Sequence, residues 1–360
     1  MIYRLLSTIT LLVSLFFCAN AQKKIIPFNN KSIYYEGRVK YDSDAAEFSW
    51  PGNSVNIRFE GNGVSAILKD GDTANYYNVI VDYKVVSKIH TDTVKHSYIL
   101  ASGLSYGLHT VQLFKRTEWD KNKTWFYGFK FSGKFHLENP PTPKKRKIEF
   151  YGNSITCGYA IEDSSSGDSF HGYYENNYLS YAAITARYFD AQYYCISKSG
   201  IGIMVSWFPL IMPEMYDRLD ATDSTSKWNF ENYTPDVVVI NLFQNDSWII
   251  KLPGNELFKY RFGDKAPGDS FIIASYKNFL QSIRNKYANA DIICTLGSMD
   301  ATQEGAPWPG YIKSAVEQMN DPKIFTHFYK YKNTKGHPNV HEQNEMAVSL
   351  IDFIEKNIKW

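Results

Sequence analysis

The chain has almost no excess of charge of either sign. Its 39 Lys and Arg residues stand against 37 Asp and Glu residues, which leaves a formal net charge of +2 over 360 residues. A net charge so close to zero gives no sign of the basic surface that attracts nucleic acids or anionic membranes. We therefore expect no nucleic-acid partner. Partners therefore have to be inferred from local motifs.

Cysteine is also scarce, with four residues in the whole chain. Cys18 lies in the N-terminal segment, and the other three have neither the spacing of a zinc site nor the even number of a disulfide framework. We expect Cys157, Cys195 and Cys294 to be small buried residues, and we expect no metal site.

Only one long apolar run is present, and it opens the chain. Residues 1–21 combine an early basic residue, an apolar stretch and the sequence Ala-Asn-Ala, which are the features of a secretory signal peptide cleaved before Gln22. Bulky Phe17 precedes Cys18 where a lipoprotein signal needs a small residue, so we do not expect lipid anchoring. No later segment approaches 18 uninterrupted apolar residues, which predicts a secreted or periplasmic protein without a membrane span.

Short alternating or aromatic runs fill the chain from about residue 31 to residue 133. Turn residues separate runs such as SVNIRFEGNGVSAILKDGD, YYNVIVDYKVV and HSYILASGL. Runs of this length and spacing are typical of antiparallel strands in a β-sandwich, which we predict over residues 22–136. The sequence HLENPPTPKKRK follows, and its prolines and basic residues predict a stiff linker with a solvated end over residues 137–147.

Beyond residue 147, predicted strands alternate with predicted helices. Apolar runs such as IEFYG, DVVVINLF and ADIICTLGS are separated by amphipathic stretches such as YLSYAAITARYF and IASYKNFLQSIRNKYA. The alternation predicts a parallel sheet covered on both faces by helices, and hence an α/β domain over residues 148–360.

Three of the predicted strands are followed by residues suited to catalysis. Ser154 follows IEFYGN, Gly200 follows YYCISKS and Asn245 follows VVVINLFQ. Ligands of parallel sheets bind outside the carboxyl ends of the strands, so we expect these loops to converge. A serine becomes a nucleophile when a base takes its proton, and the oxyanion that forms needs N–H donors. Ser154 is thus a candidate nucleophile, and the N–H groups of Ser154, Gly200 and the Asn245 side chain are candidate donors.

These residues also have purely structural interpretations. Gly202 could supply the donor in place of Gly200, or both glycines could only shape a loop. Asn245 or Asp246 could cap the next helix.

The candidate base is His337, in the sequence KGHPNVHEQNEMA. Pro338 and the start of the last predicted helix restrict the main chain there, while the ring is free to reach the carboxyl edge of the sheet. His341 begins that helix and is expected at the surface. His327 lies within a predicted strand and is expected to be a core residue.

Four sequence blocks now carry a family resemblance. GNSIT around Ser154, SKSGIGI around Gly200, NLFQND around Asn245 and GHPN around His337 resemble, in this order, the four blocks of the SGNH (GDSL-type) hydrolases. The extension ITCGYA and the sandwich sequences YYEGRV and GLHTVQLFKRTE narrow the resemblance to carbohydrate esterase family two, over nearly the whole mature chain. The resemblance implies an N-terminal jelly-roll β-sandwich followed by a flavodoxin-like three-layer α/β/α hydrolase domain.

The resemblance also implies an activity. Proteins similar to this chain are secreted, cofactor-independent esterases that remove acetyl groups from plant polysaccharides such as xylan and glucomannan or from their oligosaccharides. The matching motif positions imply that Ser154 is the nucleophile and His337 is the base, and that Ser154, Gly200 and Asn245 form the oxyanion hole. The alternatives are a carbohydrate-binding or adhesion protein without activity and a lipid or sialate esterase of the same superfamily. Retention of all four blocks favours an esterase, and no broad apolar lid supports a lipase.

Three positions depart from the family pattern. Asn153 replaces the usual Asp of the first block, and Phe243 replaces a usual Gly and is expected to narrow the cleft. Lys335 stands where many SGNH enzymes carry an Asp that orients the catalytic histidine and fixes its tautomer. The resemblance implies that some members work as a Ser–His dyad, and we therefore predict that a main-chain carbonyl orients His337.

Two tryptophans are candidate substrate contacts. Trp248 follows the third block, and Trp308 lies in EGAPWPG. Flat aromatic rings of this kind stack on sugar rings, although they also pack in protein cores.

Overall fold

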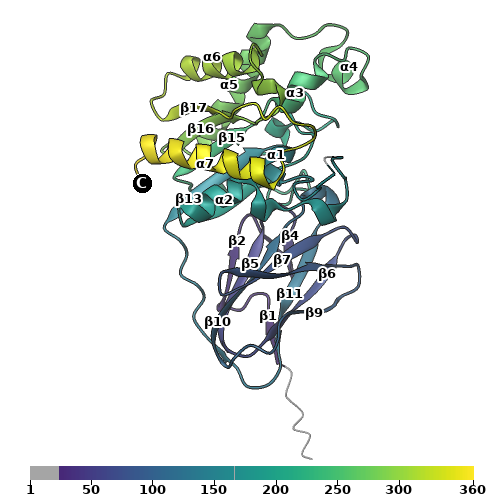
Figure 1. Ribbon diagram of the computed structural model, residues 1–360, viewed down its shortest axis with the longest axis vertical. Coiled ribbons are helices and arrows are strands. Elements are labelled where there is room, and N and C mark those ends of the chain that lie inside the picture. Colours follow the sequence, from purple (N-terminus) through teal and green to yellow (C-terminus); the bar gives the residue numbers. More distant parts are fainter. Residues whose placement is uncertain (1–23, 166) are drawn as a thin grey trace, which may run out of the picture.

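The computed structural model describes residues 24–165 and 167–360, in which a β-sandwich precedes an α/β part (Figure 1). The predicted signal peptide, residues 1–21, lies outside the described residues. Over the part of the chain that the structure describes, no helix combines the length and the apolar character that a membrane crossing requires.

The β-sandwich consists of two antiparallel sheets. One has the order β3-β4-β11-β6-β9 with β1 paired to β11, and the other has the order β12-β5-β10-β7-β8 with β2 paired to β5. The strands are β1 (Lys24–Pro27), β2 (Ile33–Glu36), β3 (Lys40–Tyr41), β4 (Ala46–Phe48), β5 (Ser54–Gly61), β6 (Val64–Asp70), β7 (Tyr76–Val81), β8 (Lys84–His90), β9 (His96–Ala101), β10 (Gly107–Lys115), β11 (Thr124–Phe131) and β12 (His136–Leu137).

Alternation along the strands explains why the two sheets stack. In β6, Val64, Ala66 and Leu68 are buried in the common core while the residues between them are less buried, because successive side chains of a strand point to opposite faces. The predicted mixed α/β class is confirmed, whereas the finer description of the sandwich as a jelly roll stays a prediction.

The connection between the two parts is shorter than predicted. Strand β12 extends the sandwich to Leu137, and β13 (Arg146–Gly152) begins two residues before the predicted start of the α/β domain. Of the basic residues at the end of this connection, Lys145 and Arg146 are exposed, whereas Lys144 is partly buried and its Nζ donates to the carbonyl of Ala191 at 3.1 Å. The domain limits as such stay a prediction.

The α/β part contains a five-stranded parallel sheet in the order β14-β13-β15-β16-β17. This order is that of flavodoxin-like folds. The remaining strands are β14 (Ala191–Ser197), β15 (Val237–Asn241), β16 (Asp291–Leu296) and β17 (Ile324–Phe328). The helices are α1 (Ser154–Cys157), α2 (Tyr181–Tyr188), α3 (Gln244–Ile249), α4 (Glu256–Phe262), α5 (Asp269–Lys286), α6 (Trp308–Met319) and α7 (Val340–Asn357).

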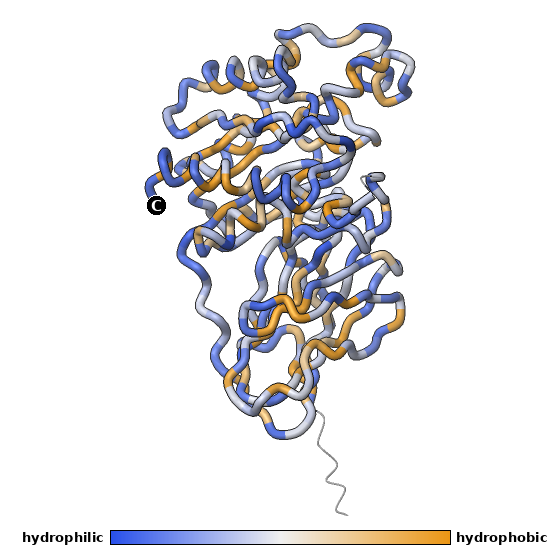
Figure 2. The backbone as a smooth tube through the Cα atoms, viewed as in Figure 1, coloured by the Kyte–Doolittle hydropathy of each residue, from blue (hydrophilic) through white to orange (hydrophobic). Residues whose placement is uncertain are grey.

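Helices cover both faces of this sheet. Helices α2 and α7 pack together over one face and α5 and α6 over the other, so that two separate hydrophobic cores flank the strands. Every residue of β15 is buried, and hydrophobic positions concentrate along the strands of the sheet (Figure 2). Strands buried on both faces are continuous apolar runs, which is the pattern seen in the sequence.

The carboxyl ends of three strands lie side by side. Gly152 at the end of β13 pairs in register with Ser197 of β14 and with Asn241 of β15. The loops that follow these strands therefore leave the same edge of the sheet.

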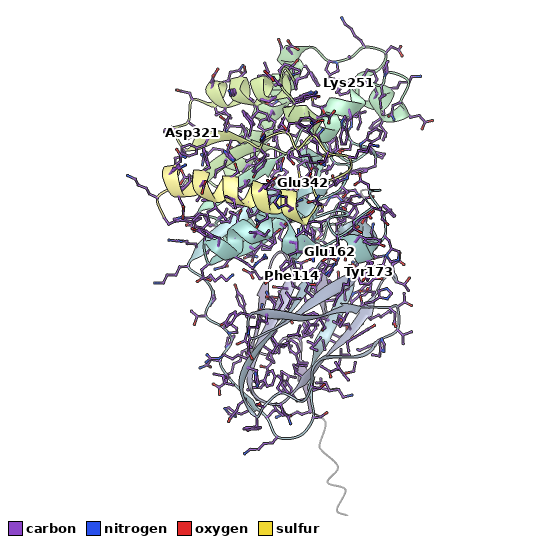
Figure 3. All side chains as sticks on the ribbon, in the orientation of Figure 1. Phe114, Glu162, Tyr173, Lys251, Asp321 and Glu342 are labelled. Carbon is purple, nitrogen blue, oxygen red and sulfur yellow. The ribbon has the colours of Figure 1, made fainter. Side chains whose placement is uncertain are left out.

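Buried polar contacts join the sandwich to the α/β part. Phe114, Glu162 and Tyr173 lie where the two parts meet (Figure 3). Arg116 of the sandwich pairs with Glu162 and donates from Nε to the carbonyl of Glu175 at 3.1 Å. Such contacts fix the sandwich relative to the loops at the carboxyl edge of the parallel sheet.

Candidate active site

Ser154 lies at a sharp turn between β13 and α1. Asn153 caps the short helix, because its Oδ1 accepts the N–H of Ile155 at 3.1 Å. The position before Asn153 requires a glycine, because a Cβ on Gly152 would lie 2.0 Å from Oγ1 of Thr156. Gly158 ends the helix in the left-handed conformation, with φ of 75°. This turn holds Ser154 at the carboxyl edge with 6% of its surface exposed.

His337 meets Ser154 from the loop between β17 and α7. Its Nε2 lies 2.8 Å from Oγ of Ser154, within hydrogen-bond distance. Asn339 caps α7 by accepting the N–H of Glu342 at 3.1 Å, which fixes where the loop ends. His341 is exposed and pairs with Glu345, as expected of a surface residue. The structure thus brings Ser154 and His337 together, and their catalytic roles stay a prediction.

A carboxylate, and not a main-chain carbonyl, accompanies the other ring nitrogen of His337. Oδ2 of Asp168 lies 2.9 Å from Nδ1, although the N–H is not aligned for a regular hydrogen bond. Oδ1 of Asp168 also accepts the main-chain N–H of His337 at 2.7 Å. The prediction that a main-chain carbonyl orients His337 is therefore wrong. Lys335 has no part in this contact, because Asp168 reaches the histidine from a different loop.

The environment of Asp168 keeps its carboxylate ionised. Partial burial acts to raise its pKa, but the hydrogen bonds and the charge interaction with His337 outweigh burial and lower the pKa below its ordinary value. The residue has φ of 52°, a left-handed conformation that Asp tolerates better than most residues. An ionised carboxylate beside Nδ1 stabilises the imidazolium that forms when His337 takes a proton.

Two main-chain N–H groups in the loops at this edge of the sheet have no acceptor in the described part of the chain. Within residues 24–165 and 167–360, neither the N–H of Ser154 nor that of Gly200 donates to a protein atom. Gly200 has φ of 81°, which favours glycine at this position. Gly202 does not compete for the same role, because its N–H donates to Oγ of Ser206 at 2.9 Å.

Asn245 is oriented by two contacts. Its Nδ2 donates to the carbonyl of Ile201 at 2.8 Å, and its Oδ1 accepts Nε1–H of Trp207 at 3.1 Å. One N–H of the amide group remains for a ligand. The residue lies inside α3, whose capping position is Phe243, so Asn245 does not cap the helix. This arrangement agrees with the predicted oxyanion role without testing it.

Asp246 holds the loop that carries Gly200. The buried carboxylate accepts the N–H groups of Ile203, Met204 and Val205 at 2.7 to 3.1 Å. Burial raises its pKa to about 6, against the lowering effect of these hydrogen bonds. The sequence alone indicates Asp246 only as a possible helix cap. No local pattern connects this residue with a loop more than 40 residues earlier in the chain.

Two expectations about aromatic residues are wrong. Trp308 is 3% exposed and packs against Phe243 with 5.1 Å between ring centroids, so it belongs to the core and is not a substrate contact. Phe243 is itself buried and does not narrow a cleft. Trp248 donates from Nε1 to the carboxylate of Asp300 at 2.7 and 2.8 Å, and its substrate role stays a prediction.

Sequence reasoning missed Trp207. The side chain is 43% exposed, its indole N–H contacts Asn245, and its main-chain N–H donates to the carbonyl of Gly200 at 3.0 Å. An exposed ring beside the candidate oxyanion donors is suited to contact a bound ligand. Trp207 lies five residues after the sequence GIG, and no pattern in a single sequence indicates that a tryptophan there would contact a ligand.

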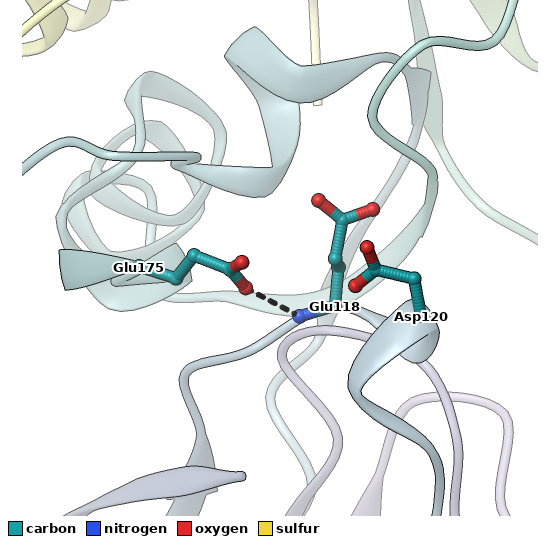
Figure 4. A group of neighbouring side chains, drawn as sticks. All are labelled: Glu118, Asp120 and Glu175. Atoms are coloured by element: carbon teal, nitrogen blue, oxygen red, sulfur yellow. Dashed lines mark hydrogen bonds between the residues drawn. The ribbon is translucent and has the colours of Figure 1, made fainter. Parts of the chain in front are cut away.

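Three carboxylates near the site have the spacing of metal ligands. Oxygen atoms of Glu118, Asp120 and Glu175 lie within 4.8 Å of one another (Figure 4). The ammonium group of Lys121 lies 3.1 Å from Glu175 and 3.2 Å from Asp120, so a cation of the chain itself already compensates part of their charge. The group therefore provides no argument for a metal ion.

A hydroxyl, an imidazole and a carboxylate placed in this order are the arrangement of the class of serine hydrolases. Comparisons with known proteins narrow this class. Residues 35–141 match the family described as Carbohydrate esterase 2 N-terminal. The chain is 34% identical over 345 residues to the cellulase/esterase CelE of Acetivibrio thermocellus, a match that covers 92% of this chain and 40% of CelE.

Two further relatives match along their whole length or nearly so. An acetylxylan esterase/glucomannan deacetylase of Cellvibrio japonicus is 24% identical, with 99% of this chain and 100% of that protein covered. A solved family two carbohydrate esterase from Clostridium thermocellum in complex with cellohexaose is 32% identical, with a TM-score of 0.79 over 90% of this chain and 98% of that chain. The chain therefore belongs to carbohydrate esterase family two, a family of carboxylic ester hydrolases.

Proposed function

We propose that the protein is a secreted O-acetyl esterase that removes acetyl groups from plant polysaccharides, such as xylan or glucomannan, or from their oligosaccharides. The observation that carries the proposal is the 2.8 Å contact between Oγ of Ser154 and Nε2 of His337, with Asp168 at the opposite ring nitrogen. The substrate class is supported by the names of the relatives, one an acetylxylan esterase/glucomannan deacetylase and one bound to cellohexaose. Secretion is supported by the signal-peptide pattern of residues 1–21.

The reaction begins with attack on the acetyl carbonyl. Nε2 of His337 takes the proton of Ser154 as Oγ bonds to the carbonyl carbon, and the oxyanion receives hydrogen bonds from the N–H groups of Ser154 and Gly200 and from Nδ2 of Asn245. Asp168 stabilises the imidazolium through Nδ1. When the tetrahedral intermediate collapses, the bond to the sugar oxygen breaks and His337 gives its proton to that oxygen.

Water completes the cycle. His337 takes a proton from a water molecule, whose oxygen attacks the acetyl–Ser154 ester, and the second tetrahedral intermediate uses the same donors. Collapse releases acetate and returns the proton to Oγ of Ser154. The exposed ring of Trp207, next to Asn245, is placed to stack on the sugar that carries the acetyl group.

Acetate release is the direct test of this proposal. We expect the mature protein to release acetate from acetylated xylan or glucomannan, and Ser154→Ala to lower kcat by about four to six orders of magnitude. Ser275→Ala, on helix α5 and outside the site, is the matched control and should keep the parent rate. A folded parent that binds these polysaccharides but releases no acetate would instead support a carbohydrate-binding protein.

A further inference from the structure

A glutamate of the sandwich touches the loop that carries Gly200. Glu118 lies between β10 and the short 3₁₀ turn Trp119–Lys121, and its side chain is completely buried. Its Oε2 accepts the main-chain N–H of Ser199 at 2.7 Å, and its Oε1 is in hydrogen-bond contact with the hydroxyl of the same residue. Ser199 directly precedes Gly200, so the sandwich holds the residue next to a candidate oxyanion donor.

Glu118 is itself fixed in place. Its main-chain N–H donates to Oε2 of Glu175 at 3.1 Å, as drawn in Figure 4, and its carbonyl accepts from Nζ of Lys115 at 3.2 Å. Lys198, the other neighbour of Ser199, places Nζ 3.8 Å from the ring centroid of Trp119. The main chain on both sides of the contact is therefore held by residues of the sandwich or close to it.

The loop is held from two directions. Residues 203–205 donate their N–H groups to Asp246 in the α/β part, whereas Ser199 is held by Glu118 of the sandwich. Gly200 lies between these two anchors, and within the described residues its own N–H has no acceptor. The direction of that N–H therefore depends on both anchors.

We propose that Glu118 is a positioning residue of the esterase, through which the β-sandwich sets the direction of the Gly200 N–H toward the oxyanion. The inference rests on the proposed function and adds a role for the sandwich in it. An oxyanion donor stabilises the transition state only when its N–H points to the place where negative charge develops. Loss of the contact from Glu118 therefore lowers the rate of the chemical step more than it changes substrate binding.

The neutral form of Glu118 is favoured by its surroundings. Burial and the neighbouring carboxylates of Asp120 and Glu175 raise the pKa of Glu118, while Lys198 and the hydrogen bond from Ser199 lower it, and the net effect is an increase. A glutamine has the shape of a neutral glutamic acid. Its amide oxygen can accept the N–H of Ser199, and its NH₂ group can donate to the Ser199 hydroxyl.

A second glutamate provides a matched control. Glu36 of β2 is also buried in the sandwich, and its Oε1 accepts the main-chain N–H of Tyr193 at 2.8 Å. Tyr193 lies near the start of β14, whereas Ser199 follows the end of the same strand. Glu36→Ala thus removes a bond of the same kind between the same two parts of the chain, but without a contact to the Gly200 loop.

The test compares kcat and KM for a small acetyl ester, 4-nitrophenyl acetate, in the full mature chain. We expect Glu118→Ala to lower kcat by about 10²-fold with little change in KM, since misplaced groups cost rates of this order. Glu118→Gln should recover most of the rate. Glu36→Ala should lose thermal stability as Glu118→Ala does, and it should keep the parent kcat. If Glu118→Ala does not fold, Ser199→Ala removes one of the two contacts and should still lower kcat.

Hydrogen exchange separates this inference from the proposed function. In Glu118→Ala, peptides covering residues 198–206 should exchange faster than in the parent, whereas in Glu36→Ala they should not. A parent without activity on any acetyl ester would refute the esterase and leave the exchange pattern to decide the positioning role. Parent-like kcat in Glu118→Ala or in Ser199→Ala, or equal exchange in this loop for the Glu118 and Glu36 variants, would overturn the inference.

Discussion

At the scale of single residues, the candidate site contains a carboxylate that the motifs do not contain. Asp168 lies 169 positions before the histidine that it contacts, in a loop without helical or strand periodicity. Lys335 stands where many SGNH enzymes carry the Asp that orients the histidine. The sequence alone therefore predicts a Ser–His dyad. Ser154 and His337 could be predicted because they belong to motifs at the ends of regular elements.

The role of Asp168 can be tested by an isosteric change. In Asp168→Asn the side chain keeps its shape but loses the charge that stabilises the imidazolium and selects the tautomer of His337. We expect kcat for a small acetyl ester to fall by about 10³- to 10⁴-fold, as similar changes do in other serine hydrolases. Steady-state kinetics from pH 6 to pH 9 measure the effect.

Lys335→Ala is the matched control for this change. Lys335 is exposed, and its main-chain carbonyl, which accepts from Lys332, is retained in the variant. The variant should keep the parent kcat. Equal rates in Asp168→Asn and the parent would show that Asp168 does not orient the base.

At the scale of elements, the loop after β14 depends on a close approach between main chains. A Cβ on Gly202 would lie 2.0 Å from the carbonyl oxygen of Val205 and 2.5 Å from Oδ2 of Asp246. No side chain fits there unless the loop moves. The loop that presents Gly200 therefore requires a glycine two residues later for packing rather than for chemistry.

Gly202→Ala should consequently reduce both stability and activity. We expect the free energy of unfolding to fall by about 2–4 kcal/mol, the range of overpacked and strained sites, and kcat to fall with it. Gly310→Ala in helix α6 is the control, because beyond the adjacent residues and backbone of its own helix no atom lies within 4 Å of the new Cβ. That variant should gain about 0.5–1 kcal/mol from the higher helix propensity of Ala. Denaturant unfolding of both variants decides the matter, and a Gly202→Ala protein as stable as the parent would contradict the packing argument.

At the scale of the whole molecule, Arg38 joins the two parts of the chain. Its buried guanidinium donates to the carbonyls of Tyr216 and Arg218 at 2.6 and 2.9 Å and to Oε1 of Glu149 at 2.9 Å. Glu149 lies in strand β13, between β14 and β15 in the sheet and close along the chain to Ser154. A residue of the sandwich thus compensates a buried charge in the strand that leads to the candidate nucleophile.

Removal of this guanidinium should destabilise the protein strongly. In Arg38→Met, Glu149 remains buried without its partner, which typically costs about 3–5 kcal/mol. Lys227→Met removes a cation whose pair with Asp217 is exposed, and exposed pairs contribute about 0–1 kcal/mol. Chemical denaturation followed by intrinsic fluorescence compares the two variants. The interpretation fails if both unfold at the same denaturant concentration as the parent.

Features that depend on neighbours along the chain could be predicted from the amino-acid sequence. Apolar runs ending near Gly152, Ser197 and Asn241 predicted parallel strands, and parallel strands place the following loops at one edge. That geometry places the loops with Ser154 and Gly200 at the same edge, and the loop before the last amphipathic helix adds His337. Periodicity also predicted the helices that cover the sheet, because burial of one face is a local pattern.

The distant groups that join the candidate site become visible only in the folded chain. Asp168 and Glu118 contact partners 169 and 81 positions away, and both lie in loops where no periodicity constrains a side chain. Trp308 is an aromatic residue of the type that contacts sugars, yet in the folded chain its ring packs in the hydrophobic core. Loop conformation and the docking of the two parts are set by contacts between residues distant in sequence, and a single sequence does not show such contacts as a local pattern.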